Sequence, residues 1–108
     1  MVRAKTCQVE EQIKLLKKEI TKRLKPSKII LFGSRARKDN FVESDVDIIV
    51  VSDKFEGMKW PRRLEKVSLM WTGNVDIEPL CYTKKEFDIK KKQVGIIQRA
   101  VMEGIELI

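Results

Sequence analysis

Hydrophobic residues recur at helical spacing through the first quarter of the chain. They stand three or four positions apart, with charged residues between them: Val9, Ile13, Leu16, Ile20 and Leu24. This period is typical of a helix that packs one apolar face against a core. Thr6 suits the N-cap of this helix, and Pro26 stands beyond its expected end.

Two short runs rich in β-prone residues follow. Residues 28–32 read Lys-Ile-Ile-Leu-Phe and stop at Gly33, and residues 44–51 end in the apolar run Ile-Ile-Val-Val. Both runs predict β-strands. A short helical turn rich in Arg and Lys is expected after Gly33. Because the link from Gly33 to Ser44 is too short for a full crossover helix, we expect the two strands to be antiparallel.

Turn and capping residues divide the second half of the chain into four further elements. Proline favours the first position of a helix, glycine favours its end, and Thr-Lys-Lys-Glu is a capping box. The expected elements are a helix from Pro61 to Gly73, a strand over Asn74–Leu80, a helix from Thr83 to Gly104 and an edge strand over Ile105–Ile108.

The expected elements alternate between helix and strand across one domain that covers residues 1–108. Such alternation ordinarily favours a parallel, doubly wound sheet. The antiparallel first pair instead predicts a mixed central sheet of about four strands with flanking helices. We therefore expect an α/β (α+β) fold.

Composition narrows the chemistry that this domain can perform. The chain has 23 Lys and Arg against 16 Asp and Glu, and its charge of +7 favours an anionic partner such as nucleotide, nucleic acid or acidic protein. It has no histidine, which excludes Ser-His-Asp triads and His-ligated zinc. No apolar run approaches the roughly 18 residues of a membrane span, so we expect a cytoplasmic protein without a membrane partner.

Paired aspartates are the first candidate for chemistry. Asp45 and Asp47 stand two positions apart, so a strand would point both carboxylates to one face. A divalent cation such as Mg²⁺ is the ordinary way to keep two such groups ionised. Asp76, expected within the third strand, adds another carboxylate if that strand lies beside the second. The alternative is a structural role in turns, where aspartates accept backbone hydrogen bonds.

A Gly-Ser dipeptide at the end of the first expected strand is the second candidate. Gly33 lets a phosphate approach the backbone, Ser34 offers a hydroxyl, and free N–H groups at a helix start attract anions. Together with Asp-x-Asp on the next strand, they predict a triphosphate cradle that faces a metal site. The neighbouring Arg35, Arg37 and Lys38 either contact the triphosphate or form solvated surface.

These motifs resemble those of the DNA polymerase beta superfamily of nucleotidyltransferases. That superfamily combines Gly-Ser, about ten residues later Asp-x-Asp, and a third acidic residue on a later strand. The matching segments here are residues 33–37, Gly-Ser-Arg-Ala-Arg; residues 44–47, Ser-Asp-Val-Asp; and residues 75–77, Val-Asp-Ile. The resemblance to the minimal nucleotidyltransferases covers nearly the whole chain and implies a polymerase beta-like fold.

The resemblance also implies a nucleotide site. Gly33 and Ser34 would hold the phosphates of a nucleoside triphosphate, ATP in the first place, with Arg35 and Arg37 beside them. One departure stands out, because Lys38 occupies a position where the subfamily commonly has glycine. A side chain there either crowds the loop or adds a phosphate contact.

The same resemblance implies roles for the three aspartates. Asp45 and Asp47 would bind two Mg²⁺ ions, with Mn²⁺ as an alternative, and Asp76 would ligate one metal and activate the attacking hydroxyl. The reaction is then in-line attack on the α-phosphate, with pyrophosphate as the leaving group.

Two functions from different classes follow. In the first, the protein transfers AMP from ATP to a hydroxyl group of a protein or another acceptor. In the second, it is a catalytically weak or idle binding protein, because minimal nucleotidyltransferases also resemble antitoxins that pair with a helical HEPN-type toxin. The two roles are compatible, because an antitoxin of this kind can neutralise its toxin by adenylylating it. Both functions allow a homodimer. A nucleic-acid-binding module is a third hypothesis that rests only on net charge.

Overall fold

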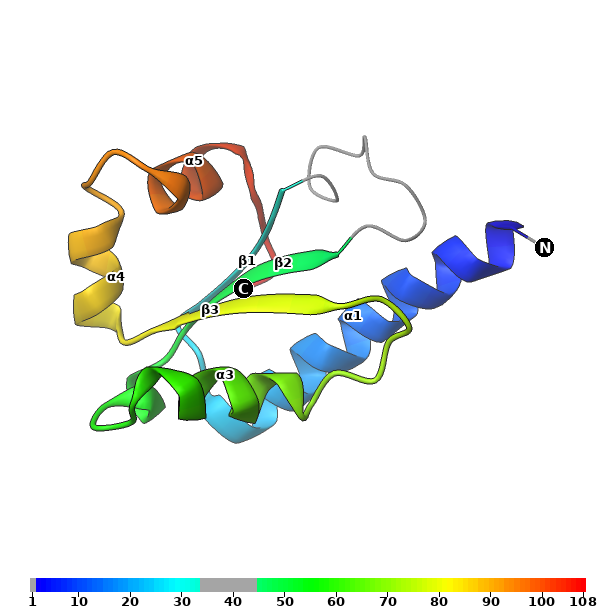
Figure 1. The fold of residues 1–108 in the computed structure, drawn as a ribbon, viewed down its shortest axis with the longest axis horizontal. Helices are drawn as coiled ribbons and strands as arrows, with labels where there is room; N and C mark the ends of the chain where they lie inside the picture. The colour runs from blue at the N-terminus through cyan, green and yellow to red at the C-terminus, as the bar shows by residue number, and fades with distance from the viewer. Residues whose placement is uncertain (1, 34–44) are drawn as a thin grey trace.

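The sheet and its helices are seen in a computed structural model, which describes residues 2–33 and 45–108 (Figure 1). The helical turn expected after Gly33 lies outside these residues. The elements are α1 (Val2–Leu24), β1 (Lys28–Phe32), β2 (Val46–Val51), a 3-10 turn η1 (Asp53–Phe55), α3 (Trp60–Ser68), β3 (Ile77–Tyr82), α4 (Lys84–Lys90), α5 (Ile96–Glu103) and β4 (Ile105–Glu106).

The four strands form one mixed sheet in the order β3-β2-β1-β4. β1 is antiparallel to both β2 and β4, and β2 is parallel to β3. The antiparallel first pair and the edge position of the last strand are therefore confirmed, as is the mixed α/β architecture. One consequence matters for the site, because Asp47 lies between Phe32 on one neighbouring strand and Glu78 on the other.

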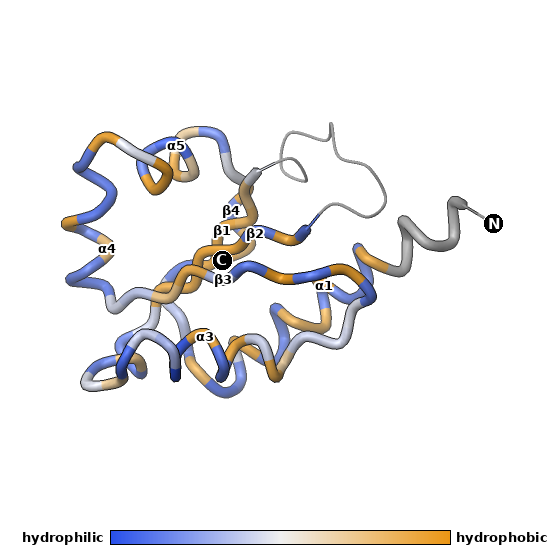
Figure 2. The backbone as a smooth tube through the Cα atoms, viewed as in Figure 1, coloured by the Kyte–Doolittle hydropathy of each residue, from blue (hydrophilic) through white to orange (hydrophobic). Residues whose placement is uncertain are grey.

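Helices cover both faces of the sheet, with α1 and α3 on one side and α4 and α5 on the other (Figure 1). Neighbouring residues of the central strands are therefore buried in opposite directions. Ile48 packs with the α1 side and Ile49 with the α5 side, and both are fully buried. This arrangement explains why the central strands are continuous apolar runs (Figure 2). None of the helices in the described ranges is long and apolar enough to cross a membrane.

The prediction of one helix from Thr83 to Gly104 is wrong, because this part of the chain forms two helices. The capping box is present, with reciprocal hydrogen bonds between Thr83 and Glu86, but α4 ends at Lys90. Five residues then turn the chain before α5, and Gly95 adopts a φ of 153° that favours glycine. Lys91 and Lys92 lie within this turn, and Val94 is 94% exposed, so these residues offer no buried apolar contact that would continue the helix.

Other boundaries also differ from expectation. α1 begins at Val2, so Thr6 lies inside the helix and is not its N-cap. α3 ends at Ser68, and Trp71 folds back beyond it so that its indole N–H donates to the Val75 carbonyl. That loop delays the third strand, which begins at Ile77 rather than Asn74.

A buried arginine ties α3 to α4. Arg63 donates from Nε to the Met58 carbonyl and from Nη1 to the Cys81 carbonyl, and its guanidinium pairs with Glu86 at 2.6 Å. The hydrogen bond from Arg63 lowers the pKa of the Glu86 carboxyl. Since Glu86 also closes the capping box of α4, one carboxylate fixes both the start of that helix and its contact with α3.

Candidate functional site

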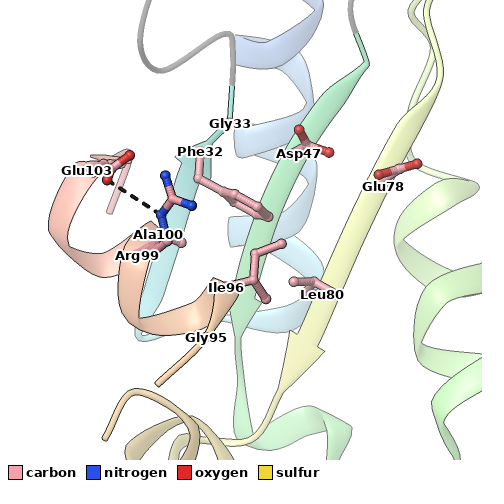
Figure 3. Close-up of a pocket in the computed structure, with 10 residues that line it drawn as sticks. All are labelled: Phe32, Gly33, Asp47, Glu78, Leu80, Gly95, Ile96, Arg99, Ala100 and Glu103. Atoms are coloured by element: carbon pink, nitrogen blue, oxygen red, sulfur yellow. Dashed lines mark ion pairs between the residues drawn. The ribbon is translucent and has the colours of Figure 1, made fainter. Parts of the chain in front are cut away.

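A cavity of about 610 Å³ lies between the sheet and α5 (Figure 3). Part of its wall is apolar, and carboxylates on the strands face charged side chains on the helix. The lining residues are Phe32, Gly33, Asp47, Glu78, Leu80, Gly95, Ile96, Arg99, Ala100 and Glu103. The cavity therefore offers acidic, basic and apolar surface within one hollow.

Asp47 and Glu78 form the acidic part of this cavity. The parallel register of β2 and β3 sets them directly opposite each other, so both side chains project from the same face of the sheet. Burial, the hydrogen bond and charge of Glu78, and the charge of Asp45 raise the pKa of the Asp47 carboxyl to about 6. The protein thus holds two carboxylates together that repel each other when both are ionised.

Gly33 closes against the Asp47 carboxylate from the neighbouring strand. Its φ of +77° is a left-handed conformation, which glycine adopts without steric cost. A Cβ atom at this position would overlap Oδ2 of Asp47. The absence of a side chain therefore keeps both the turn and the position of the carboxylate.

Asp45 and Asp76 lie at the mouth of the site, one residue before β2 and β3 respectively. The sequence predicted Asp76 within the third strand, but the strand begins one residue later, at Ile77. Both side chains are exposed. The N–H of Val46 donates to the Asp76 carbonyl at 2.9 Å, so the parallel register continues one step and brings Asp76 beside Asp45. Four carboxylates consequently follow two adjacent strands in two facing pairs.

The structure brings together Gly33 and Asp47 and places Asp45 and Asp76 next to each other, whereas Ser34, Arg35, Arg37 and Lys38 lie outside the described residues. Sequence reasoning missed Glu78. The available signal was its position two residues after Asp76, which puts both side chains on one face of a strand.

The acidic residues suit a divalent cation only in part. In residues 2–33 and 45–108, no three acidic or cysteine side chains are grouped closely enough to hold a metal ion, so the expected cluster of Asp45, Asp47 and Asp76 is not formed there. Mg²⁺, however, is commonly held by one or two carboxylates together with substrate phosphates. The adjacent carboxylates of Asp47 and Glu78 fit that mode.

The basic side of the cavity belongs to α5. Arg99 and Glu103 stand one helical turn apart, and Nε of Arg99 lies 3.7 Å from Oε2 of Glu103 (Figure 3). Both side chains are largely exposed. Exposed pairs of this kind contribute little to stability, so the guanidinium is free to take another partner at low cost.

Comparison with known proteins places this geometry in a family. The family model described as the nucleotidyltransferase domain matches residues 13–106. A protein of Methanocaldococcus jannaschii, named as a candidate protein adenylyltransferase, is 35% identical over 81 residues, which cover 71% of this chain and 82% of the relative.

Two solved structures resemble the chain, and the description of one of them agrees with this family. The crystal structure of a candidate nucleotidyltransferase from Sulfolobus solfataricus has a TM-score of 0.57 and 26% identity, over 92% of this chain and 84% of that one. BolA1 from Arabidopsis thaliana, with a TM-score of 0.58 and 20% identity over 69% of this chain and 94% of its own, shares the fold alone. With the family model spanning most of its length, the chain belongs to the nucleotidyltransferase domain family.

Proposed function

We propose that the protein transfers AMP from ATP to a hydroxyl group on another protein, in a reaction that needs a divalent cation. The observation that carries this proposal is the pair formed by Asp47 and Glu78, held in register inside the cavity and closed by the bare backbone of Gly33. Membership of the nucleotidyltransferase family supports the reaction class. The name of the archaeal relative supports a protein as the acceptor.

Asp47 and Glu78, with Asp45 at the mouth, would hold Mg²⁺ or Mn²⁺. A bound cation supplies Lewis-acid stabilisation of the charge that develops on phosphoryl oxygens. The chain's own groups do the rest. Gly33 packs directly against the Asp47 carboxylate and so fixes its position in the cavity, where a bound cation would share the phosphates. Asp76 is exposed at the mouth, where a hydroxyl on a separate protein can reach it, and its carboxylate would accept the proton of that hydroxyl.

Metal binding tests the acidic pair directly. Titration of the purified chain with Mn²⁺ in a calorimeter is expected to give binding that Asp47→Asn and Glu78→Gln both weaken by at least tenfold. Glu65→Gln is the matched control, because Glu65 is an exposed carboxylate on α3 that does not line the cavity. Equal Mn²⁺ affinity in all four proteins would contradict the assignment.

A second candidate function is that of a catalytically weak binding protein, which is the antitoxin role with a helical HEPN-type partner. One observation favours it. The end of the chain exposes large hydrophobic side chains, with Met102 79%, Val101 43% and Ile105 38% exposed. Exposed apolar residues grouped in this way mark protein-binding surfaces. If this function is the correct one, the wild type would transfer no AMP. The variant Asp45→Asn/Asp47→Asn would still bind the partner.

A further inference from the structure

The α5 wall of the cavity carries a cation that the acidic motif does not use. Ile96, Arg99, Ala100 and Glu103 recur at helical spacing and all line the cavity (Figure 3). Ala100 is only 3% exposed, whereas Val101 and Met102 lie on the outer side of the helix. Arg99 therefore lies on the side of α5 that borders the cavity, where its guanidinium is accessible to a ligand.

The partner of Arg99 within the helix holds it weakly. The 3.7 Å separation between Arg99 and Glu103 is longer than a hydrogen bond, so the two groups form an ion pair that is not hydrogen-bonded. Side-chain exposures of 72% for Arg99 and 48% for Glu103 mean that water screens this attraction. The planar N–H donors of the guanidinium consequently remain available to an anion.

The same cavity holds carboxylates on one side and this guanidinium on the other. A nucleoside triphosphate that shares a cation with Asp47 and Glu78 leaves further phosphate oxygens unneutralised. Arginine matches phosphate oxygens well, because its donors lie in one plane and reach two oxygens at once. Arg99 supplies this complement from the wall opposite the acidic pair.

We propose that Arg99 binds the phosphates of the incoming triphosphate, and that Glu103 holds Arg99 only while the cavity is free of nucleotide. Nucleotide binding then exchanges a carboxylate partner for a phosphate partner. Arg99 is thus a substrate-binding residue, and Glu103 is a positioning residue that acts through it. This inference rests on the proposed nucleotidyl transfer and adds a residue that the Gly-Ser and Asp-x-Asp motifs do not contain.

Calorimetric binding of ATP in the presence of Mn²⁺ tests the role of Arg99. Arg99→Gln is expected to weaken ATP binding about tenfold, the size of one charge-assisted contact to phosphate. Arg99→Lys keeps the charge but loses the planar arrangement of donors, so its ATP affinity should fall between those of the wild type and Arg99→Gln. Arg62→Gln is the control, because Arg62 is exposed on α3 outside this cavity. AMP binding changes much less than ATP binding, a difference that a merely structural role for Arg99 would not produce.

Substitution of Glu103 should change the ATP affinity in the opposite direction. Glu103→Gln removes the competing carboxylate, and ATP is expected to bind about threefold more tightly. Glu106→Gln is the matched control, since it also removes one negative charge and breaks an exposed ion pair, with Lys28, outside the cavity. The improvement disappears in Arg99→Gln/Glu103→Gln if Glu103 acts through Arg99, as a double-mutant cycle shows directly.

Three outcomes overturn the inference. Unchanged ATP affinity in Arg99→Gln removes Arg99 from the site, and an equal loss for AMP and ATP makes its role structural. A Glu103→Gln improvement that persists without Arg99 makes Glu103 a direct repulsive group. Mn²⁺ binding without nucleotide separates this inference from the proposed function. If wild type binds Mn²⁺ and ATP while Arg99→Gln behaves as wild type, only the inference fails; if wild type binds neither, both fail.

Discussion

Replacing Asp47 by asparagine should stabilise the metal-free protein at neutral pH, although it removes a residue of the proposed active site. Asparagine has nearly the same size as aspartate and can still hydrogen-bond to Glu78, but it carries no charge. The carboxylate that it replaces is half-buried and faces both Glu78 and Asp45. The substitution therefore relieves repulsion without opening a cavity.

The size of the effect follows from the raised pKa of Asp47. A rise from 3.8 to about 6 corresponds to about 3 kcal/mol at about 1.4 kcal/mol per pKa unit. Because the side chain is only half-buried, screening by solvent reduces the expected contribution to about 1 kcal/mol. For a domain of this length, that difference moves Tm by about 4 °C.

The pH dependence has a defined sign. The folded state binds the Asp47 proton more tightly than the unfolded state, so this group favours folding below about pH 4, and that stability is lost as pH rises toward 6. Asp47→Asn lacks this dependence. Its advantage over wild type should therefore be close to zero at pH 3.5 and reach about 1 kcal/mol at pH 7.

Urea unfolding in EDTA at a series of pH values between 3.5 and 7.5 measures this difference. Glu65→Gln, which removes a carboxylate outside the cavity, should follow the wild type at every pH. Added Mn²⁺ should stabilise the wild type, by preferential binding to the folded state, and leave Asp47→Asn unchanged. An Asp47→Asn variant that is less stable than wild type at pH 7 in EDTA, or a difference independent of pH, would show that the Asp47 carboxylate is not destabilised by its burial and by Glu78.

Three further outcomes are expected. Gly33→Ala should lower the unfolding free energy by about 1–2 kcal/mol, because φ is +77° and the new Cβ overlaps Asp47. The substitution should also weaken Mn²⁺ binding, and denaturation with and without the metal measures both effects. Glu86→Gln should lower the free energy of unfolding by about 1 kcal/mol at neutral pH after screening by solvent. Because Arg63 lowers the pKa of Glu86, this loss of stability should shrink as pH falls through the acidic range, and urea titrations measure it. The isolated chain should self-associate at high concentration, and Met102→Glu on the exposed apolar surface should restore a 12.6 kDa monomer in light scattering.

The strands and their burial could be predicted because they depend on local patterns. The run of Ile48 to Val51 is apolar at every position, and the structure buries it on both faces of the sheet. The short link after β1 allowed no crossover helix, which fixed the antiparallel pairing of β1 and β2. Gly33 was predicted from the turn that ends β1, and its contact with Asp47 adds a second reason for glycine there.

The partner of Asp47 could not be predicted in the same way, because it depends on the register between two strands that are distant in sequence. A loop delayed the start of β3 to Ile77, and this start sets Glu78 rather than Asp76 opposite Asp47. The break between α4 and α5 was missed for a related reason. Val94 continued the apolar period of the expected helix by coincidence, whereas the folded chain leaves it 94% exposed.

The same non-local packing creates the cavity and its second wall. Arg99 and Glu103 follow a helical period that is visible in the sequence, but the turn at residues 91–95 decides which face of α5 meets the sheet. An uninterrupted helix from the capping box would direct these side chains elsewhere. The sequence therefore indicated the acidic motif, and the tertiary packing adds the residues that lie opposite it.

Transfer of the α-phosphate label from ATP to protein measures the proposed adenylyl transfer itself. The wild-type chain is incubated with α-labelled ATP and Mg²⁺ in an extract of the source organism, beside Asp45→Asn/Asp47→Asn, Asp76→Asn and the Glu65→Gln control. Labelled protein is expected with wild type and with Glu65→Gln, and none in EDTA or with the double variant. Asp76→Asn should lose at least 100-fold in labelling while it retains its ATP affinity. Equal labelling with Asp45→Asn/Asp47→Asn, or no labelling by the wild type, would contradict the proposed transfer.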